Sequence, residues 1–295
     1  MTPHDAWRSW DWQPLTVGGL VAVAWAYGRG VRSLWDRRPG RGVRRWQAVC
    51  FFAGLVWLFV ALVSPLHAMS GSLLSAHMAQ HLLLIAVAPP LLVLGAPALV
   101  IGAALPESWR TTGRRMGRWR VLRSLGRAFG NPVASWLLAL VALWGWHAPS
   151  LYQAAVRHEW VHALEHITFV ATALLFWWTA LQPTGVRRLA RGLDVLYVFT
   201  GSFQGAALGF LFAFASAPLY PVYSATAPAW GLTAIQDQQL AGVIMWLPSG
   251  LIYLVAAGWL FLQWLQAIER ATRRLEGRGA AVEPASASGF EPVAE

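Results

Sequence analysis

Two segments of the sequence place histidines one helical turn apart. His77 and His81 are four residues apart, and the segment HEWVHALEHITF (158–169) repeats this spacing twice, with Glu165 next to the last histidine. Residues three or four apart share one face of a helix, so each segment predicts a row of imidazoles that point the same way. Imidazole and carboxylate groups gathered in this manner are typical ligands of transition metals.

Other possible ligands lie near these two segments once the apolar runs are drawn as helices. His147 ends the segment WGWH, and Asp237 and Met245 lie in the first turns of the last apolar run. We therefore expect residues from several helices to meet in one pocket that binds a metal. The complete candidate set is His77, Met78, His81, His147, His158, His162, Glu165, His166, Asp237 and Met245.

The types of ligand in this set favour copper. Thioether and imidazole together suit Cu(I), whereas imidazole with carboxylate also suits Zn(II) or Cu(II). The single cysteine, Cys50, lies in an apolar run away from the histidines, so the sequence can form neither a disulfide framework nor a pair of thiolate ligands. We expect copper, with zinc or haem as alternatives.

The elements that position these residues are predicted to be membrane-spanning helices. Hydrophobic residues make up 57% of the 295 and charged residues only 12%, which is unusual for a soluble domain. A bilayer core needs about 20 apolar residues per helix. Seven runs meet or approach this length: 14–30, 46–65, 76–104, 132–148, 159–181, 193–217 and 237–264. The sequence thus predicts an all-α, polytopic membrane protein with seven transmembrane helices.

Arginine placement predicts the orientation of these helices. The chain has no lysine, and 21 of its 23 basic residues lie in 29–45, 105–131, 182–192 and after 264. Basic residues are retained on the cytoplasmic side of a membrane, so we expect the N-terminus outside and the C-terminus in the cytoplasm. The net charge of +10 is then a consequence of topology, and no nucleic-acid partner is expected.

The topology divides the chain into three parts and places the histidines on one side. We expect an outer N-terminal segment (1–13), a transmembrane domain (14–264) and a cytoplasmic Arg-rich extension with a disordered tail (265–295). Residues 1–13 lack the features of a cleaved signal peptide. All eight histidines fall at the outer side, although His4 and His67 lie in segments predicted to be exposed and are not expected to contribute.

Glycines and prolines in these runs are interpreted as structural. Gly201, Gly205 and Gly209 recur every fourth residue, a pattern that lets two helix backbones approach closely. The pair Pro89-Pro90 and the single Pro248 are expected to interrupt or kink their helices.

Two alternative functions remain open from the residues alone, and a third is excluded. His162-x-x-Glu165-His166 reads as H-x-x-E-H, two zinc ligands with a general base, which would make the chain an intramembrane metallohydrolase. Histidines on facing helices would also suit a haem-binding or haem-transfer protein. A retinal protein is excluded because its Schiff base needs a lysine.

At these residues the chain resembles the CtaG family of cytochrome c oxidase (caa-type) assembly factors. Four parts of the sequence carry the resemblance and together span about 46 to 265. They are HMAQHLLLIAVAPPLLVLGAPA (77–98), WGWHAPSLYQAAV (144–156), HALEHITFVATALLFWW (162–178), and SAPLYPVYS with DQQLAGVIMWLPSG (216–224 and 237–250).

The resemblance implies a multi-pass protein of the plasma (inner) membrane that helps to assemble the oxidase of the respiratory chain and is not an enzyme. Its partners would be oxidase subunits, the lipid bilayer and an outer copper donor protein. The positions that correspond to the family motifs are His77, Gln80, His81, His147, His162, Glu165, His166, Asp237, Gln238 and Met245. The implied function is delivery of copper to the oxidase from an outward-facing vestibule.

Overall fold

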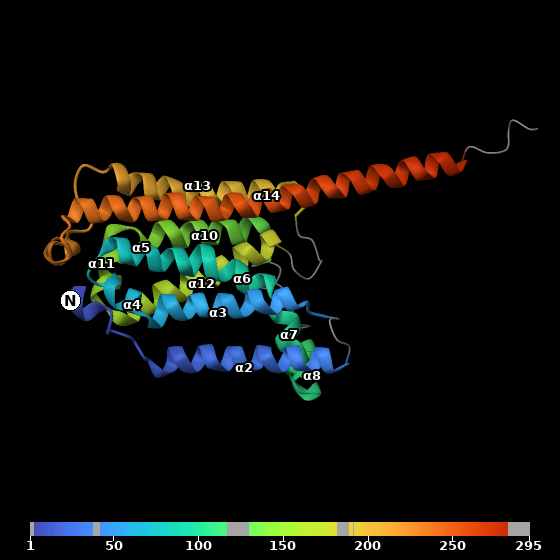
Figure 1. The fold of residues 1–295 in the computed structure, drawn as a ribbon, viewed down its shortest axis with the longest axis horizontal. Coiled ribbons are helices and arrows are strands. Elements are labelled where there is room, and N and C mark those ends of the chain that lie inside the picture. The colour runs from blue at the N-terminus through green and yellow to red at the C-terminus, as the bar shows by residue number, and fades with distance from the viewer. Residues whose placement is uncertain (1–2, 38–41, 117–129, 182–188, 191, 283–295) are drawn as a thin grey trace, which may run out of the picture.

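The computed structural model describes residues 3–37, 42–116, 130–181, 189–190 and 192–282, and within these ranges the secondary structure is helical. The longer helices run nearly parallel to one another, with the N-terminal segment at one end of the bundle (Figure 1). Residues 283–295, where a disordered tail was expected, lie outside the described residues, as does the side chain of His4. The chain is therefore a helical bundle, as expected from its apolar runs.

Five helices of the described chain are long and apolar enough to cross a membrane. They are Arg45–Val63 (α3), Leu74–Leu94 (α5, η1 and α6), Glu159–Leu181 (α12), Leu193–Phe214 (α13) and Ala234–Glu276 within α14. The first and fourth expected spans form α2 (Pro14–Arg37) and α10 (Pro132–Trp146). Helix α10 has only 15 residues, and α2 contains four charged residues in its second half, so seven spans remain a prediction.

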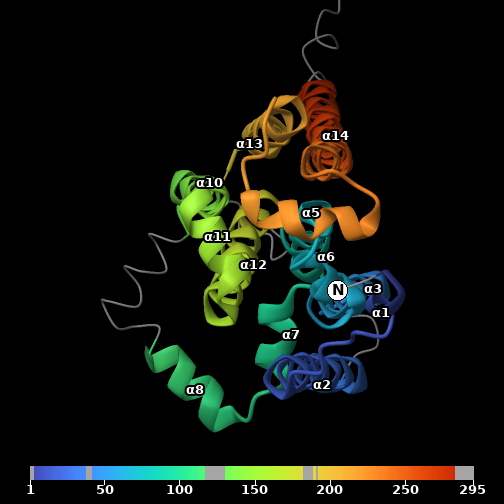
Figure 2. The same ribbon diagram turned by 90° about the vertical axis from the view of Figure 1, so that its left-hand side faces the viewer.

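The expected third span of 76–104 is wrong at its end, because the chain turns after Leu94. Ala96 adopts a left-handed conformation, with φ 48° and ψ 51°, and Pro97 follows it, which prevents the helix from continuing straight. The last carbonyls before the turn accept hydrogen bonds from Gln47 and Tyr27. Helix α7 (Pro97–Ala104) then packs against α2, as Figure 2 shows, and α8 (Glu107–Met116) follows.

Helix α5 (Leu74–Leu82) continues into a π-helical stretch, Leu83–Val87, before α6 (Ala88–Leu94). Pro89 has no N–H to donate to the carbonyl four residues before it. That carbonyl, Ile85 O, instead accepts a hydrogen bond from the indole Nε1 of Trp177, at 3.0 Å. The proline pair therefore accompanies a change of the helical repeat, and the carbonyl that Pro89 leaves without a donor bonds to Trp177 of α12. Pro248, in contrast, lies inside α14 (Ala234–Val282) without ending it.

Small residues allow α13 and α14 to pack backbone to backbone. A Cβ atom on Gly209 would lie 2.7 Å from Gly242 O, and one on Gly242 would lie 2.5 Å from Gly209 O. A Cβ on Gly201 would lie 2.5 Å from the ring of Phe176. At Gly205 the nearest atom would be 3.8 Å away. The interpretation of the glycines as packing positions is confirmed at Gly201 and Gly209.

Short helices cover the end of the bundle that holds the N-terminal segment. They are α1 (Pro3–Ala6), α4 (Pro65–Ser70), α11 (Pro149–Arg157) and two 3₁₀ turns, Pro221–Ala225 and Ala227–Trp230. The segment that contains the 3₁₀ turns crosses over α5 (Figure 2). Tyr223 and Ala227 of this segment are buried. This cover lies over the histidine-bearing ends of α5 and α12 (Figure 2).

Candidate metal centre

Four side chains from α5 and α12 meet in the interior of the bundle. His77 and His81 come from α5, and Glu165 and His166 from α12, and their ligand atoms all lie within 4.8 Å of one another. All four residues are buried, with Glu165 fully so. We call these four residues the histidine–glutamate cluster.

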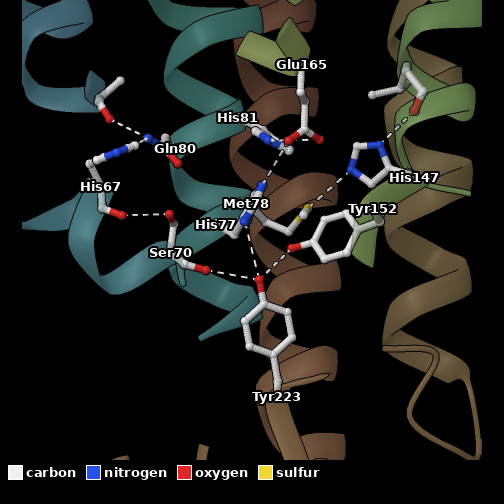
Figure 3. A network of polar contacts seen from close by, with 12 residues as sticks. His67, Ser70, His77, Met78, Gln80, His81, His147, Tyr152, Glu165 and Tyr223 are labelled. Carbon is white, nitrogen blue, oxygen red and sulfur yellow. Dashed lines mark hydrogen bonds and ion pairs between the residues drawn. The ribbon is translucent and has the colours of Figure 1, made fainter. Parts of the chain in front are cut away.

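Glu165 lies between the two histidines of α5. Its Oε2 is 3.6 Å from His77 Nε2 and its Oε1 is 3.6 Å from His81 Nε2, and both histidines and the carboxylate can be followed in Figure 3. A tetrahedral site with bonds of about 2.0–2.1 Å has ligand–ligand edges of about 3.3–3.4 Å. Small side-chain movements would thus bring these atoms to bonding distance of one ion.

The cluster contains buried polar atoms that find no partner within the described parts of the protein. Both carboxylate oxygens of Glu165, both ring nitrogens of His81, and Nε2 of His77 and of His166 lack a hydrogen bond. Buried polar groups without a partner are uncommon in folded proteins and need an explanation. An ion held between these atoms supplies one, so the donor set fits a metal.

Tyrosines fix the protonation of His77. The Tyr223 hydroxyl donates to Ser70 O at 3.0 Å, so its oxygen accepts from the Tyr152 hydroxyl at 2.8 Å and from His77 Nδ1 at 3.3 Å. Burial raises the pKa of Tyr223 and of Tyr152, which keeps both phenols protonated. His77 then carries its proton on Nδ1 and presents a lone pair on Nε2 to Glu165.

A hollow of about 360 Å³ leads from the covered end of the bundle to the cluster. We call it the vestibule, and Asp11, His67, His77, Glu159 and His162 are among its lining residues. Two of these are carboxylates, which favour entry of cations over anions.

The imidazoles of His67 and His162 stack inside the vestibule, with ring centroids 5.4 Å apart. His67 Nε2 lies 3.2 Å from Asp11 Oδ2, and His67 Nδ1 accepts a hydrogen bond from Gln80 Nε2 at 2.9 Å. His67 was expected to be exposed and uninvolved, but the structure places it in the lining of the vestibule. It lies in the short helix α4, outside the helical rows of histidines, so spacing did not reveal this position.

The sulfur candidates lie in a buried cluster beside the histidines. Met78 Sδ is 3.4 Å from His147 Nε2, and Met78 and Met245 belong to one buried cluster. His147 Nδ1 bonds to Leu143 O at 2.7 Å. His147 thus approaches the cluster from α10, with its ring centroid 5.5 Å from that of His81.

Two members of the expected set lie apart from these groups. His158 is exposed at the junction of α11 and α12. Asp237 accepts hydrogen bonds from the backbone N–H groups of Leu74 and Ser75, at 2.6 and 3.0 Å. Both oxygens of Asp237 therefore cap the first turn of α5 and do not point to the cluster.

Gln80, Gln238 and Tyr223 support the site in ways that spacing alone does not reveal. Gln80 Nε2 also donates to Ala61 O at 2.7 Å, and Gln238 Oε1 accepts from the N–H of Leu219 at 2.6 Å, fixing the segment that carries Tyr223. The signal available in the sequence was an amide beside each ligand segment, in HMAQH and DQQ.

Three mycobacterial proteins are similar to this chain in sequence. An uncharacterized protein of Mycobacterium bovis and one of Mycobacterium tuberculosis are each 28% identical over 273 residues, and one of Mycobacterium leprae is 26% identical over 278. These matches cover 89–90% of this chain but only 40–41% of each relative, so the chain spans about two fifths of their length. No solved structure matches it.

A family model covers most of the chain. The model, described as cytochrome c oxidase caa3 assembly factor (Caa3_CtaG), matches residues 25–267. The match includes α5, α12 and the segments that surround the histidine–glutamate cluster. The resemblance drawn from the sequence motifs is thereby confirmed. The chain belongs to the family of cytochrome c oxidase caa3 assembly factors.

Proposed function

We propose that this assembly factor binds copper in the histidine–glutamate cluster and passes it to an oxidase subunit. Copper is here the cargo that the protein carries, and no chemical conversion of a substrate is involved. The vestibule is the entry route, where Asp11 and Glu159 attract the cation.

The observation that carries the proposal is the set of buried acceptor atoms without donors. His77 presents a bare Nε2, and Glu165 presents two oxygens that receive no hydrogen bond from any described residue. Such a pocket is costly when it is empty, because nothing replaces the water that its polar atoms lost. A cation satisfies all of these atoms at once.

The proposed orientation places the vestibule outside the cell. Among the described residues, Arg37 ends α2 and Arg44 and Arg45 begin α3 at the end of the bundle away from the N-terminal segment (Figure 1), and cytoplasmic loops carry an excess of basic residues. We propose seven spans in the plasma membrane, with α2 and α10 added to the five long apolar helices. An outer copper donor would then load the vestibule, and an oxidase subunit would receive the ion.

Metal analysis of the purified full chain tests the proposal. Copper should co-purify with the wild type and be lost from the double variant His77→Ala/His81→Ala. The matched control is His158→Ala, which removes an exposed histidine that adjoins α12 but lies outside the cluster. Copper retained by the double variant would refute the site, and cells that load their oxidase with copper without this protein would refute the delivery role.

Glu165→Gln distinguishes a carrier from a hydrolase. It removes the one carboxylate of the cluster, and we expect copper affinity to fall at least about 10- to 100-fold, the loss that follows replacement of a group that only supports a metal ligand. Glu159→Gln, in the vestibule, is the control and should have a smaller effect. Hydrolytic turnover in the wild type, abolished by Glu165→Gln with zinc still bound, would overturn the carrier proposal in favour of a metallohydrolase.

A further inference from the structure

The contact between His147 and Met78 is not an ordinary hydrogen bond. Leu143 O is a carbonyl and can only accept, so the 2.7 Å contact places the imidazole proton of His147 on Nδ1. His147 Nε2 then carries a lone pair and faces the sulfur of Met78, also a lone-pair atom, at 3.4 Å. A second proton on Nε2 would place a buried charge beside a thioether, which is unfavourable.

From this geometry we infer a second, softer Cu(I) site formed by His147 Nε2, Met78 Sδ and His81, adjacent to the histidine–glutamate cluster. A tetrahedral ion with bonds of about 2.0 Å to nitrogen and 2.3 Å to sulfur separates those ligands by about 3.5 Å. The observed 3.4 Å matches this edge. Thioether and imidazole are the ligands that suit Cu(I).

His81 connects the two sites. Both of its ring nitrogens lack a hydrogen-bond partner in the described chain. A neutral imidazole carries one lone pair and one N–H, so His81 serves one ion at a time, with either nitrogen as the ligand atom. Its ring centroid lies 4.4 Å from that of His77 and 5.5 Å from that of His147. Figure 3 shows His81 with Glu165 on one side of the network and Met78 with His147 on the other.

The surroundings of the second site contain a further thioether. His81, Met78 and Met245 line a small cavity of about 60 Å³ between α5, α13 and α14. This cavity is separate from the vestibule, because the two share no lining residue: the vestibule is lined by His77 and the cavity by His81. From the vestibule inward, the available metal-ligand atoms thus change from nitrogen and oxygen to nitrogen and sulfur.

This order of donors describes a relay, and it rests on the proposed function. Copper moves as Cu(I): bonds to His77, His166 and Glu165 break while bonds to Met78, His147 and His81 form. The ion keeps its charge throughout, so no electron donor or acceptor is required. Exchange between adjacent ligand sets lets copper leave a site without being released as a free ion.

The test measures copper stoichiometry and sulfur coordination in the purified full chain under reducing conditions. We expect two Cu(I) ions per wild-type chain, and X-ray absorption should show a copper–sulfur distance near 2.3 Å. Met78→Leu, which conserves volume, should bind one ion and lose the sulfur signal. Met69→Leu is the matched control, because Met69 packs in a different cluster, and it should bind two.

The outcomes separate the inference from the proposed function. One ion per wild-type chain, with nitrogen and oxygen ligands only, overturns the second site and leaves the carrier proposal standing. No copper in the wild type overturns both. The absorption measurement on the wild type decides the matter even where a substituted chain fails to fold, and His147→Gln, which should also remove the second ion, provides an independent variant.

Discussion

Replacing Asp237 should destabilise the fold without removing a metal ligand. Both of its oxygens accept hydrogen bonds from the start of α5, at Leu74 N and Ser75 N. Hydrogen bonds to a charged group contribute about 1.5–3 kcal/mol each, and a buried N–H left without a partner is unfavourable. We expect Asp237→Ala to lower the free energy of unfolding by about 3 kcal/mol. Asp237→Asn, which keeps one acceptor oxygen, should lower it by about half as much.

Thermal unfolding in detergent micelles, followed by metal analysis, measures both consequences. At about 2.1 cal/mol/K of unfolding entropy per residue, 1 kcal/mol shifts the Tm of a 295-residue chain by about 1.6 °C, so Asp237→Ala should lose about 5 °C. Copper bound per folded chain should not change. Asp36→Asn, an exposed acid of α2, is the control and should shift Tm little. Loss of copper with Tm unchanged would refute the capping role and identify Asp237 as a ligand.

Two further substitutions test the packing and the vestibule. Gly242→Ala should destabilise the protein by about 1–3 kcal/mol, because the added Cβ meets backbone atoms of α13 at 2.5 Å. Gly258→Ala is the control and should not destabilise it, because the space around Gly258 is open. Equal unfolding temperatures of the two variants would contradict the close approach of α13 and α14. Burial lowers the pKa of His67 below its usual 6.5, against the opposing charge of Asp11. The unfolded chain then binds the extra proton first as pH falls, so stability should decrease below about pH 6.5, and His67→Gln should flatten that part of a Tm–pH profile.

The rows of histidines could be predicted from the sequence, because their four-residue spacing matches the helical repeat and places each row on one face of its helix. His77 and His81, four residues apart, and the Glu165-His166 pair are on the facing sides of two apolar helices. The predicted set of ten residues included these four, but it also included His158 and Asp237, which lie apart from them. Whether these four bind copper is a separate prediction, since proximity supplies ligands but does not name the ion.

Other features could not be predicted because they depend on contacts distant in sequence. The third span ends at Leu94 because the backbone turns at Ala96. Tyr27 and Gln47 donate hydrogen bonds to the carbonyl groups that this turn leaves without a helical partner. His67 enters the vestibule through α4, a six-residue helix with no periodic signal. From the sequence alone Asp237 is a possible metal ligand. Only the position of α5 in the structure shows that its carboxylate caps that helix.

Helix α14 is long enough to connect the vestibule end of the bundle with the opposite end and to extend beyond it (Figure 1). Its 49 residues give about 74 Å at 1.5 Å per residue, more than twice the roughly 30 Å of a bilayer core, and it projects beyond the other helices (Figure 1). Asp237 and Met245 lie in the same helix, on the N-terminal side of Pro248. A force applied at its far end is thus carried along the helix, through the turn that contains Pro248, to the residue that caps α5 and to the thioether beside the histidines.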